Sequence, residues 1–280
     1  MPSLLPPSTD AVPHAVAPVR TSRAAVWMPF ALVLLGLLAV VALKVPFWTR
    51  LLPALIITLG FALFARILGG VANTGSAAGF LVTSLLFVCG GPAMFVAVLL
   101  VFLLTLAATK FGRVKKQSLT IAERPGGRDG AQVLANVGIS AIFAALSVLT
   151  PYRLVFLLGS LAALTEAACD TVSSETGKAL TLDARLVTSG RSVPAGTDGA
   201  ISLPGTVLGV IAAALVAGEG VVTGLIDLRR AGVVTLAGVL GMFLDSLLGA
   251  TLEQRGWLTN NSVNLMSTTA AALLATIVAW

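Results

Sequence analysis

The chain has 280 residues, of which 57% are hydrophobic and 11% charged, and its formal net charge is +6. Its mean hydropathy of +0.98 exceeds what a water-soluble core needs. Apolar runs recur along the chain at about the 20 residues with which a helix spans the hydrocarbon layer of a bilayer. The composition therefore predicts an all-α protein, a polytopic bundle of transmembrane helices. It excludes a water-soluble domain, and the continuous runs exclude a β-barrel, whose strands are short and alternating.

Residues 1–23 are polar and contain five prolines, which predicts a disordered cytoplasmic tail before a single transmembrane domain over residues 24–280. Nine apolar runs predict nine spans, at residues 24–43, 51–68, 76–90, 92–109, 131–149, 154–168, 201–226, 233–250 and 263–278. Two alternatives leave the count between seven and nine. The glycines and proline at 90–92 mark either a hairpin turn or a kink in one bent helix. The run at 201–226 is interrupted at 218–220, so it is either one tilted helix or a span with a re-entrant piece.

The orientation follows from the basic residues of the loop after the fourth span, which are Lys110, Arg113, Lys115, Lys116, Arg124 and Arg128. Short basic loops face the cytoplasm, so nine spans place the N-terminus and the polar segment 170–200 there as well. We expect the inner membrane of a bacterial cell. Because the basic residues lie in short loops, anionic headgroups or phosphate-bearing substrates are the expected partners, and nucleic acid is not.

A weak internal repeat is visible in the sequence. Residues 102–109 resemble residues 243–251 with one gap, and Asn136 corresponds to Asn264. This pattern predicts two three-helix units on either side of the span that ends at Asp170.

Few kinds of catalytic chemistry are open to this chain. Its cysteines, Cys89 and Cys169, lie in apolar surroundings without metal-ligand spacing, which argues against a disulfide or a zinc site. Its single histidine, His14, lies in the polar tail, so a Ser-His-Asp or Cys-His arrangement is not available. Any chemistry therefore depends on carboxylates, Lys or Arg, hydroxyls, amides and a metal ion.

A dense group of polar residues follows the sixth apolar run. Charged side chains in a membrane cost about 2.5 to 3.5 kcal/mol at the bilayer centre, so they usually face a bundle interior or a watery cavity. Glu166 and Asp170 share a helix face, as do Asp170, Ser174 and Lys178 if the helix continues. Glu175 and Lys178 can pair at a separation of three. The group indicates a site; the alternative is a solvated helix end or an ion pair that only fixes packing.

Asp245 stands among apolar residues with no basic residue within one helical turn. Its charge therefore requires a partner from another segment or a bound cation. A metal ion shared with Asp170 or Glu175 is one solution, and a lysine from another span is the other.

Two further segments carry polar groups suited to a ligand, which is phosphate for the first segment and a metal ion or sugar hydroxyls for the second. The glycine-rich segment 194–205 runs into a helix, and such a junction offers free N–H groups and the positive end of the helix dipole, although it can also serve only as a turn. Segment 257–264 holds more asparagines than a helix cap needs. Arg113, Lys115, Lys116 and Arg191 add positive charge for a polyphosphate, although membrane anchoring explains the first three equally well.

Five segments in order resemble the integral-membrane family that includes plant and cyanobacterial phytyl-phosphate kinase. They are residues 169–177, 185–188, 196–206, 244–251 and 260–264, and the resemblance covers roughly residues 69–280. It implies transfer of a phosphoryl group from a nucleoside triphosphate, CTP or ATP, to an isoprenoid monophosphate. A monophosphate acceptor already carries an anionic oxygen near neutral pH, so the reaction needs no histidine base.

The resemblance also implies roles for individual residues. Asp170, Glu175 and Asp245 would hold Mg²⁺, and Lys178 would stabilise charge on the transferred group. The expected substrate and nucleotide contacts are Glu166, Ser174, Arg113, Arg191, Gly196, Thr197, Asp198, Gly199, Asn260, Asn261 and Asn264. The alternative from another functional class is a transporter or flippase for a lipid-linked phosphate.

Overall fold

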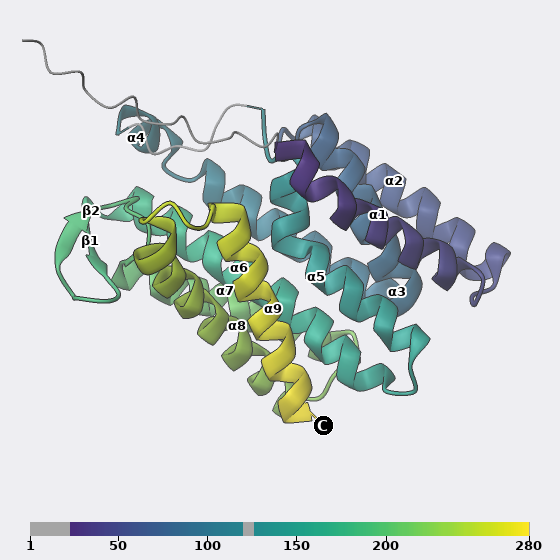
Figure 1. The fold of residues 1–280 in the computed structure, drawn as a ribbon. Coiled ribbons are helices and arrows are strands. Elements are labelled where there is room, and N and C mark those ends of the chain that lie inside the picture. Colours follow the sequence, from purple (N-terminus) through teal and green to yellow (C-terminus); the bar gives the residue numbers. More distant parts are fainter. Residues whose placement is uncertain (1–22, 120–125, 280) are drawn as a thin grey trace, which may run out of the picture.

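A computed structural model describes residues 23–119 and 126–279 of the chain. In these ranges the helices form one bundle, and a small sheet projects from one end of it (Figure 1). The helices are α1 (Arg23–Ala42), α2 (Leu52–Ile67), α3 (Asn73–Lys110), α4 (Arg113–Ser118), α5 (Gly130–Leu149), α6 (Arg153–Leu180), α7 (Leu203–Val222), α8 (Leu228–Leu248) and α9 (Asn260–Ala279). The predicted tail lies outside the described residues, except for Arg23, which begins α1.

Within the described residues, seven helices are long and apolar enough to cross a membrane. This number confirms the predicted class and lies within the predicted range of seven to nine. The first of these helices joins α2 to a short π-helical segment, η1 (Phe47–Leu51), and the sixth joins α8 to a second one, η2 (Gly249–Glu253). The count treats α3 as one helix of 38 residues, although its course is not straight.

The helix α3 turns back at Gly91, so the hairpin alternative at residues 90–92 is the right one. Gly91 has φ 76° and ψ −165°, a conformation that glycine adopts readily, and Pro92 follows it. The rings of Phe87 and Phe95 lie 5.5 Å apart, whereas eight residues of straight helix would separate them by about 12 Å. We call residues 73–90 the first arm and residues 92–110 the second arm.

Both arms return to the same end of the bundle. Just before the first arm, the amide of Ala72 donates to the carbonyl oxygen of Arg128 at 2.9 Å. At the end of the second arm, Lys110 Nζ donates to the carbonyl oxygen of Leu68 at 3.2 Å. The loop between α2 and the first arm therefore contacts both the residue before α5 and the end of the second arm.

The helix α6 lies at the centre and packs against α3, α5, α7, α8 and α9. The predicted span ends at residue 168, whereas α6 continues to Leu180, so the alternative of a helix that continues through Lys178 is the right one. Its last turns remain buried between α7 and the second arm of α3 rather than emerging into water. Close packing helps: Gly205 of α7 lies against the backbone of Ser173 and Gly177.

The helix α7 runs without interruption through Glu219 to Val222, so the single-helix alternative for this run is right. The start of the predicted run belongs to a small sheet. Its strands are β1 (Asp183–Leu186), β2 (Ser192–Pro194) and β3 (Ala200–Ile201), and they pair antiparallel in the order β2-β1-β3. In Figure 1 the strands and α4 project from one end of the bundle, and the C-terminus lies at the other.

Candidate functional site

Three carboxylates from α6 and α8 form a cluster near the sheet end of the bundle. Glu166, Asp170 and Asp245 lie within electrostatic reach of one another, and we call them the carboxylate cluster. Glu166 is 1% exposed, and its Oε1 atom has no hydrogen-bond partner. The helices approach closely because Gly241 faces Glu166, where a Cβ atom would lie 2.5 Å from Glu166 Cγ.

Asp245 receives neutral partners from α9, and not the lysine from another span that was one of the two predicted alternatives. Ser267 Oγ donates to Asp245 Oδ2 at 3.2 Å. With its amide nitrogen facing Asp245, Asn264 donates to the same oxygen at 3.1 Å and accepts from Asn136 Nδ2 at 3.0 Å. No basic side chain forms an ion pair with Asp170 or Asp245 in the part of the chain that the structure describes. Asp245 is thus oriented by neutral donors, and in the described ranges an ion pair neutralises neither carboxylate.

Glu175 lies in a different setting, an ion pair inside the bundle. Its Oε1 accepts from Lys178 at 3.0 Å, which confirms the pairing predicted from their spacing, and its Oε2 accepts from Lys116 at 2.6 Å. Lys116 is fully buried and also donates to the carbonyl oxygens of Ala108 and Thr109 at 3.1 and 2.8 Å. The structure therefore ties the end of the second arm to α6 through Glu175.

The three carboxylates expected to share a metal ion are not brought into one group. The charge of Glu175 acts on Asp170, but both of its oxygens accept from lysines, whereas Asp170 and Asp245 belong to the carboxylate cluster. Over residues 23–119 and 126–279, no three His, Cys, Asp or Glu side chains are placed to hold one metal ion.

Replacing Lys116 by methionine should destabilise the protein by about 2 to 3 kcal/mol, because a buried carboxylate loses one of two charged partners and two carbonyl groups lose a donor. Lys178 stays in place, which keeps the loss below that of a wholly unpaired charge. The free energy of unfolding in detergent would be measured by denaturant titration. The neighbouring Lys115→Met is the matched control, because Lys115 is less buried and donates only to the carbonyl oxygen of Ala179. Equal stability of the two variants would contradict the assigned ion pair.

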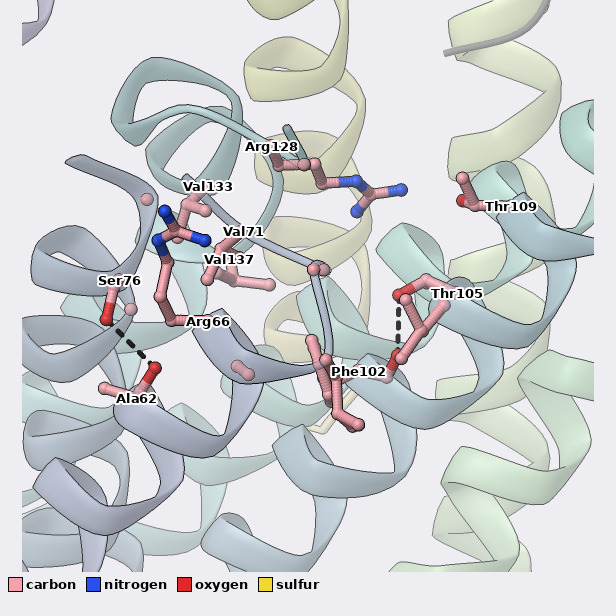
Figure 2. Close-up of a pocket in the computed structure, with 18 of the residues that line it drawn as sticks. Ala62, Arg66, Val71, Ser76, Phe102, Thr105, Thr109, Arg128, Val133 and Val137 are labelled. Atoms are coloured by element: carbon pink, nitrogen blue, oxygen red, sulfur yellow. Dashed lines mark hydrogen bonds between the residues drawn. The ribbon is translucent and has the colours of Figure 1, made fainter. Parts of the chain in front are cut away.

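A cavity of about 370 Å³ lies next to this region, between α2, both arms of α3 and α5 (Figure 2). Its deep end is apolar and buried, with Val82, Val98 and Val101 among its walls. Its other end carries the basic residues Arg66, Lys110, Arg113 and Arg128, which we call the basic mouth. None of the described residues that line the cavity is acidic. An apolar chain with an anionic head would match this distribution of side chains.

Arg128 is the member of the basic mouth that connects the cavity to the carboxylate cluster. Its Nη2 donates to Thr171 Oγ1 at 3.3 Å, directly after Asp170 on α6, and its charge acts on Asp170. The backbone fixes its position, since its amide donates to the carbonyl oxygen of Gly70 at 3.1 Å. Figure 2 shows the guanidinium groups of Arg128 and Arg66 at the same end of the cavity.

In the sequence, Arg128 stands out only as one charge of a basic loop. A local signal was present: Asp129 and Gln132 form a capping box at the start of α5, with hydrogen bonds of 2.9 Å in both directions. A helix start fixes the residue before its cap, so Arg128 could have been recognised as an ordered side chain.

The glycine-rich loop lies beside Asp245, as a phosphate-binding role requires. Gly199 has φ 72°, and a Cβ there would lie 2.2 Å from the amide nitrogen of Ala250 in η2. Gln254 Nε2 donates to the carbonyl oxygen of Asp198 at 2.7 Å, and the Asp198 charge reaches Asp245. Gly196 has φ 90°, and Thr197 Oγ1 donates to the Pro194 carbonyl oxygen at 2.7 Å within the same turn.

The other predicted site residues lie at the start of α9, at the basic mouth or at exposed positions. Asn260 and Asn261 begin α9 one turn before Asn264, and Arg113 is part of the basic mouth. Arg191 is exposed in the turn between β1 and β2, and Ser174 is exposed on α6 with its hydroxyl donating to the Thr171 carbonyl oxygen. The structure thus places Arg113 with the cavity, and it places neither Arg191 nor Ser174 against the carboxylate cluster.

Comparison with known proteins gives a family and several relatives. Residues 56–272, from α2 into α9, match the family described as integral membrane protein DUF92. Protein VTE6, chloroplastic, of Arabidopsis thaliana is 32% identical over 216 residues, which are 74% of this chain and 64% of VTE6. The chain thus spans less than two thirds of that plant protein.

Two microbial relatives are also similar. Uncharacterized membrane protein sll0875 of Synechocystis is 36% identical over 188 residues, covering 65% of this chain and 72% of the relative. Uncharacterized membrane protein MJ0933 of Methanocaldococcus jannaschii is 34% identical over 196 residues, covering 69% and 79%. No solved structure matches the chain.

Proposed function

Since the chain belongs to the DUF92 family of integral membrane proteins, which also includes VTE6, we propose that it is an isoprenoid monophosphate kinase embedded in the membrane. It would transfer a phosphoryl group from CTP or ATP to phytyl phosphate or a similar prenyl phosphate and so give the diphosphate. The observation that carries this proposal is the position of Arg128, which joins the basic mouth of an apolar cavity to the carboxylate cluster. The resemblance to the phytyl-phosphate kinase family supports the same chemistry.

The reaction asks little of the protein beyond positioning and charge stabilisation. An oxygen of the acceptor monophosphate attacks the γ-phosphorus of the nucleotide, and the bond from that phosphorus to the bridging oxygen breaks. The nucleoside diphosphate leaves with the electron pair. Because the second pKa of a phosphate monoester is about 6, the attacking oxygen is already ionised near neutral pH. A site without a histidine can therefore perform the transfer.

Asp170 and Asp245 fit a magnesium site. Mg²⁺ is usually bound by one or two carboxylates together with substrate phosphates and water, and these two carboxylates lack an ion-pair partner among the described residues. When bound, the ion would neutralise charge on the transferring phosphoryl oxygens. Asn264 and Ser267 would orient Asp245. We assign Glu175 to positioning Lys178, because lysines occupy both of its oxygens.

The remaining residues would bind the two phosphate groups. Arg128 would hold the acceptor phosphate on the side of the basic mouth, next to Asp170. The loop over Gly196–Gly199 would hold the donor phosphates, next to Asp245, through its N–H groups other than that of Thr197, which donates to the Pro194 carbonyl oxygen. Lys178 would stabilise charge on the group in transfer. Glu166, Asn260 and Asn261 would complete the polar wall.

The same end of the bundle would face the cytoplasm of a bacterial cell, with the protein in the inner membrane. The basic loop before α5 and the positive-inside rule support this orientation. Soluble CTP or ATP could then reach the sheet end directly.

The proposal is tested by incubating the purified protein with geranylgeranyl or phytyl monophosphate, Mg²⁺ and CTP or ATP. We expect nucleotide-dependent formation of the diphosphate and its loss when EDTA is added. The rival function, a transporter, is tested after the purified protein has been reconstituted into proteoliposomes. Movement of the prenyl phosphate across the bilayer without nucleotide turnover would identify a transporter and contradict the kinase.

A further inference from the structure

The cavity between α2, both arms of α3 and α5 has walls and charges that suit one kind of ligand. We propose that it binds the isoprenoid chain of the acceptor along its length, with the phosphate at the basic mouth. This inference rests on the proposed function for the identity of the acceptor. The new elements are the place where the isoprenoid chain binds and the residue that limits the length of that chain.

The walls are suited to a hydrocarbon chain. Phe61, Val82, Val98, Val101 and Phe102 line the cavity, and the Phe61 and Phe102 rings meet edge to face with centroids 5.4 Å apart. The volume of about 370 Å³ lies within the roughly 300 to 1,000 Å³ typical of small-molecule sites. Val98 near the deep end and Lys110 at the mouth are twelve residues apart on the second arm, which corresponds to about 18 Å. The lining of the cavity thus extends over several turns of the second arm.

The charges are suited to a phosphate monoester. Four cationic side chains stand at one end and no acidic residue lines the cavity in the described ranges. A phosphate monoester carries a charge of about −1.5 to −2 at neutral pH, which such a mouth attracts. A free phosphate or a nucleotide would satisfy the mouth but would leave the apolar walls without a partner. The combination therefore favours a phosphate attached to a hydrocarbon chain.

The position of Arg128 also connects the cavity to the proposed site of phosphoryl transfer. Arg128 lines the cavity and at the same time contacts Thr171, the residue after Asp170. A phosphate held at the mouth by Arg128 would therefore face the carboxylate cluster, while its chain extends away from it between the arms of α3.

Gly79 is the residue that we expect to limit chain length. It lies on the first arm, lines the cavity, and has open space where a Cβ atom would be. By contrast, a Cβ on Gly70 or Gly75 of the same wall would collide with Phe102 or with the backbone of Arg128. A side chain added at Gly79 therefore fills space that the isoprenoid chain would occupy, without pushing neighbouring protein atoms aside.

The test compares Gly79→Leu and Gly79→Ala with wild type on a long acceptor, geranylgeranyl phosphate, and a short one, geranyl phosphate. We expect Gly79→Leu to raise KM for the long acceptor at least about tenfold more than for the short one, with Gly79→Ala intermediate. Gly232→Leu on α8 is the matched control, because Gly232 also has open space but does not line the cavity. Thermal stability in detergent reports whether each variant folds, and the alanine variant keeps the test decisive if leucine is not tolerated.

The outcomes separate this inference from the proposed function. Equal shifts for both acceptors, or the same shift in Gly232→Leu, would overturn the cavity assignment while leaving the kinase intact. If no acceptor is phosphorylated, direct binding of geranylgeranyl phosphate still tests the cavity, since wild type should bind it and Gly79→Leu should bind it at least about tenfold more weakly. Competition that is equally strong with inorganic phosphate, or with CTP alone, would show that the site recognises a phosphate without its chain and would also overturn it.

Discussion

Asp170→Asn and Asp245→Asn should each lower kcat by about 1,000-fold. Asparagine keeps the shape of the side chain but removes the charge, and with it about 4 kcal/mol of transition-state stabilisation that a metal-bound phosphoryl group receives. The two carboxylates come from different helices and meet in the carboxylate cluster, and neither forms an ion pair with a basic side chain among the described residues. Kinetics of diphosphate formation at several Mg²⁺ concentrations, with circular dichroism to verify folding, would measure the effect.

The control for this prediction is Asp227→Asn at the opposite end of the bundle. Asp227 caps α8 through the amide of Arg230, and asparagine caps helices equally well. Its activity should match wild type within about twofold, because exposed charges contribute little. Full activity in both Asp170→Asn and Asp245→Asn would show that the carboxylate cluster has no part in the reaction.

Arg128→Gln should lower kcat/KM by about 100-fold, the effect of removing one donor that stabilises developing charge. Glutamine keeps a hydrogen-bonding group but loses both the charge and the fork that binds two phosphate oxygens. Arg128→Lys should recover only part of the loss, since lysine restores the charge without the fork. Steady-state kinetics with varied acceptor would separate kcat from KM.

Arg66→Gln provides the comparison within the basic mouth. Arg66 is exposed and donates to Asn73 Oδ1 at 2.7 Å, and Figure 2 shows its guanidinium group apart from that of Arg128. We expect a rise in KM of less than about tenfold and little change in kcat, as for a charge that attracts the acceptor without meeting the reacting atoms. Equal loss of kcat in Arg66→Gln and Arg128→Gln would contradict the special position of Arg128.

Much of the membrane fold could be predicted from the sequence because bilayer thickness sets the length of each apolar run. The turn at Gly91 was predictable as a hairpin or a kink, and only packing between the two arms distinguishes these. The pairing of Glu175 with Lys178 followed from helix geometry, as did the need of Asp245 for a partner from another segment. The small sheet between α6 and α7 was not predicted, since its strands are only two to four residues long.

The parts that were missed depend on contacts between distant segments. Lys116 belongs to a loop whose basic residues are typical of membrane-surface anchors. It is nevertheless buried against the carboxylate of Glu175, 59 residues away in the sequence. The same contact explains why α6 continues past its predicted end, since Glu175 is neutralised inside the bundle. The cavity has no sequence signature of its own, because α2, two arms of one helix and α5 each supply a wall. Arg128 gained its significance only when that cavity and Asp170 were placed on either side of it.

The most direct test of the kinase follows the phosphorus atom itself. Purified wild type and Asp245→Asn would be incubated with geranylgeranyl phosphate, Mg²⁺ and CTP or ATP labelled at the γ-phosphorus, and the lipid fraction would then be separated. The account predicts that label appears in the terminal phosphate of the lipid diphosphate with wild type, one label per nucleotide consumed, and falls about 1,000-fold with the variant. Label released only as inorganic phosphate, or lipid diphosphate formed equally by the variant, would contradict it.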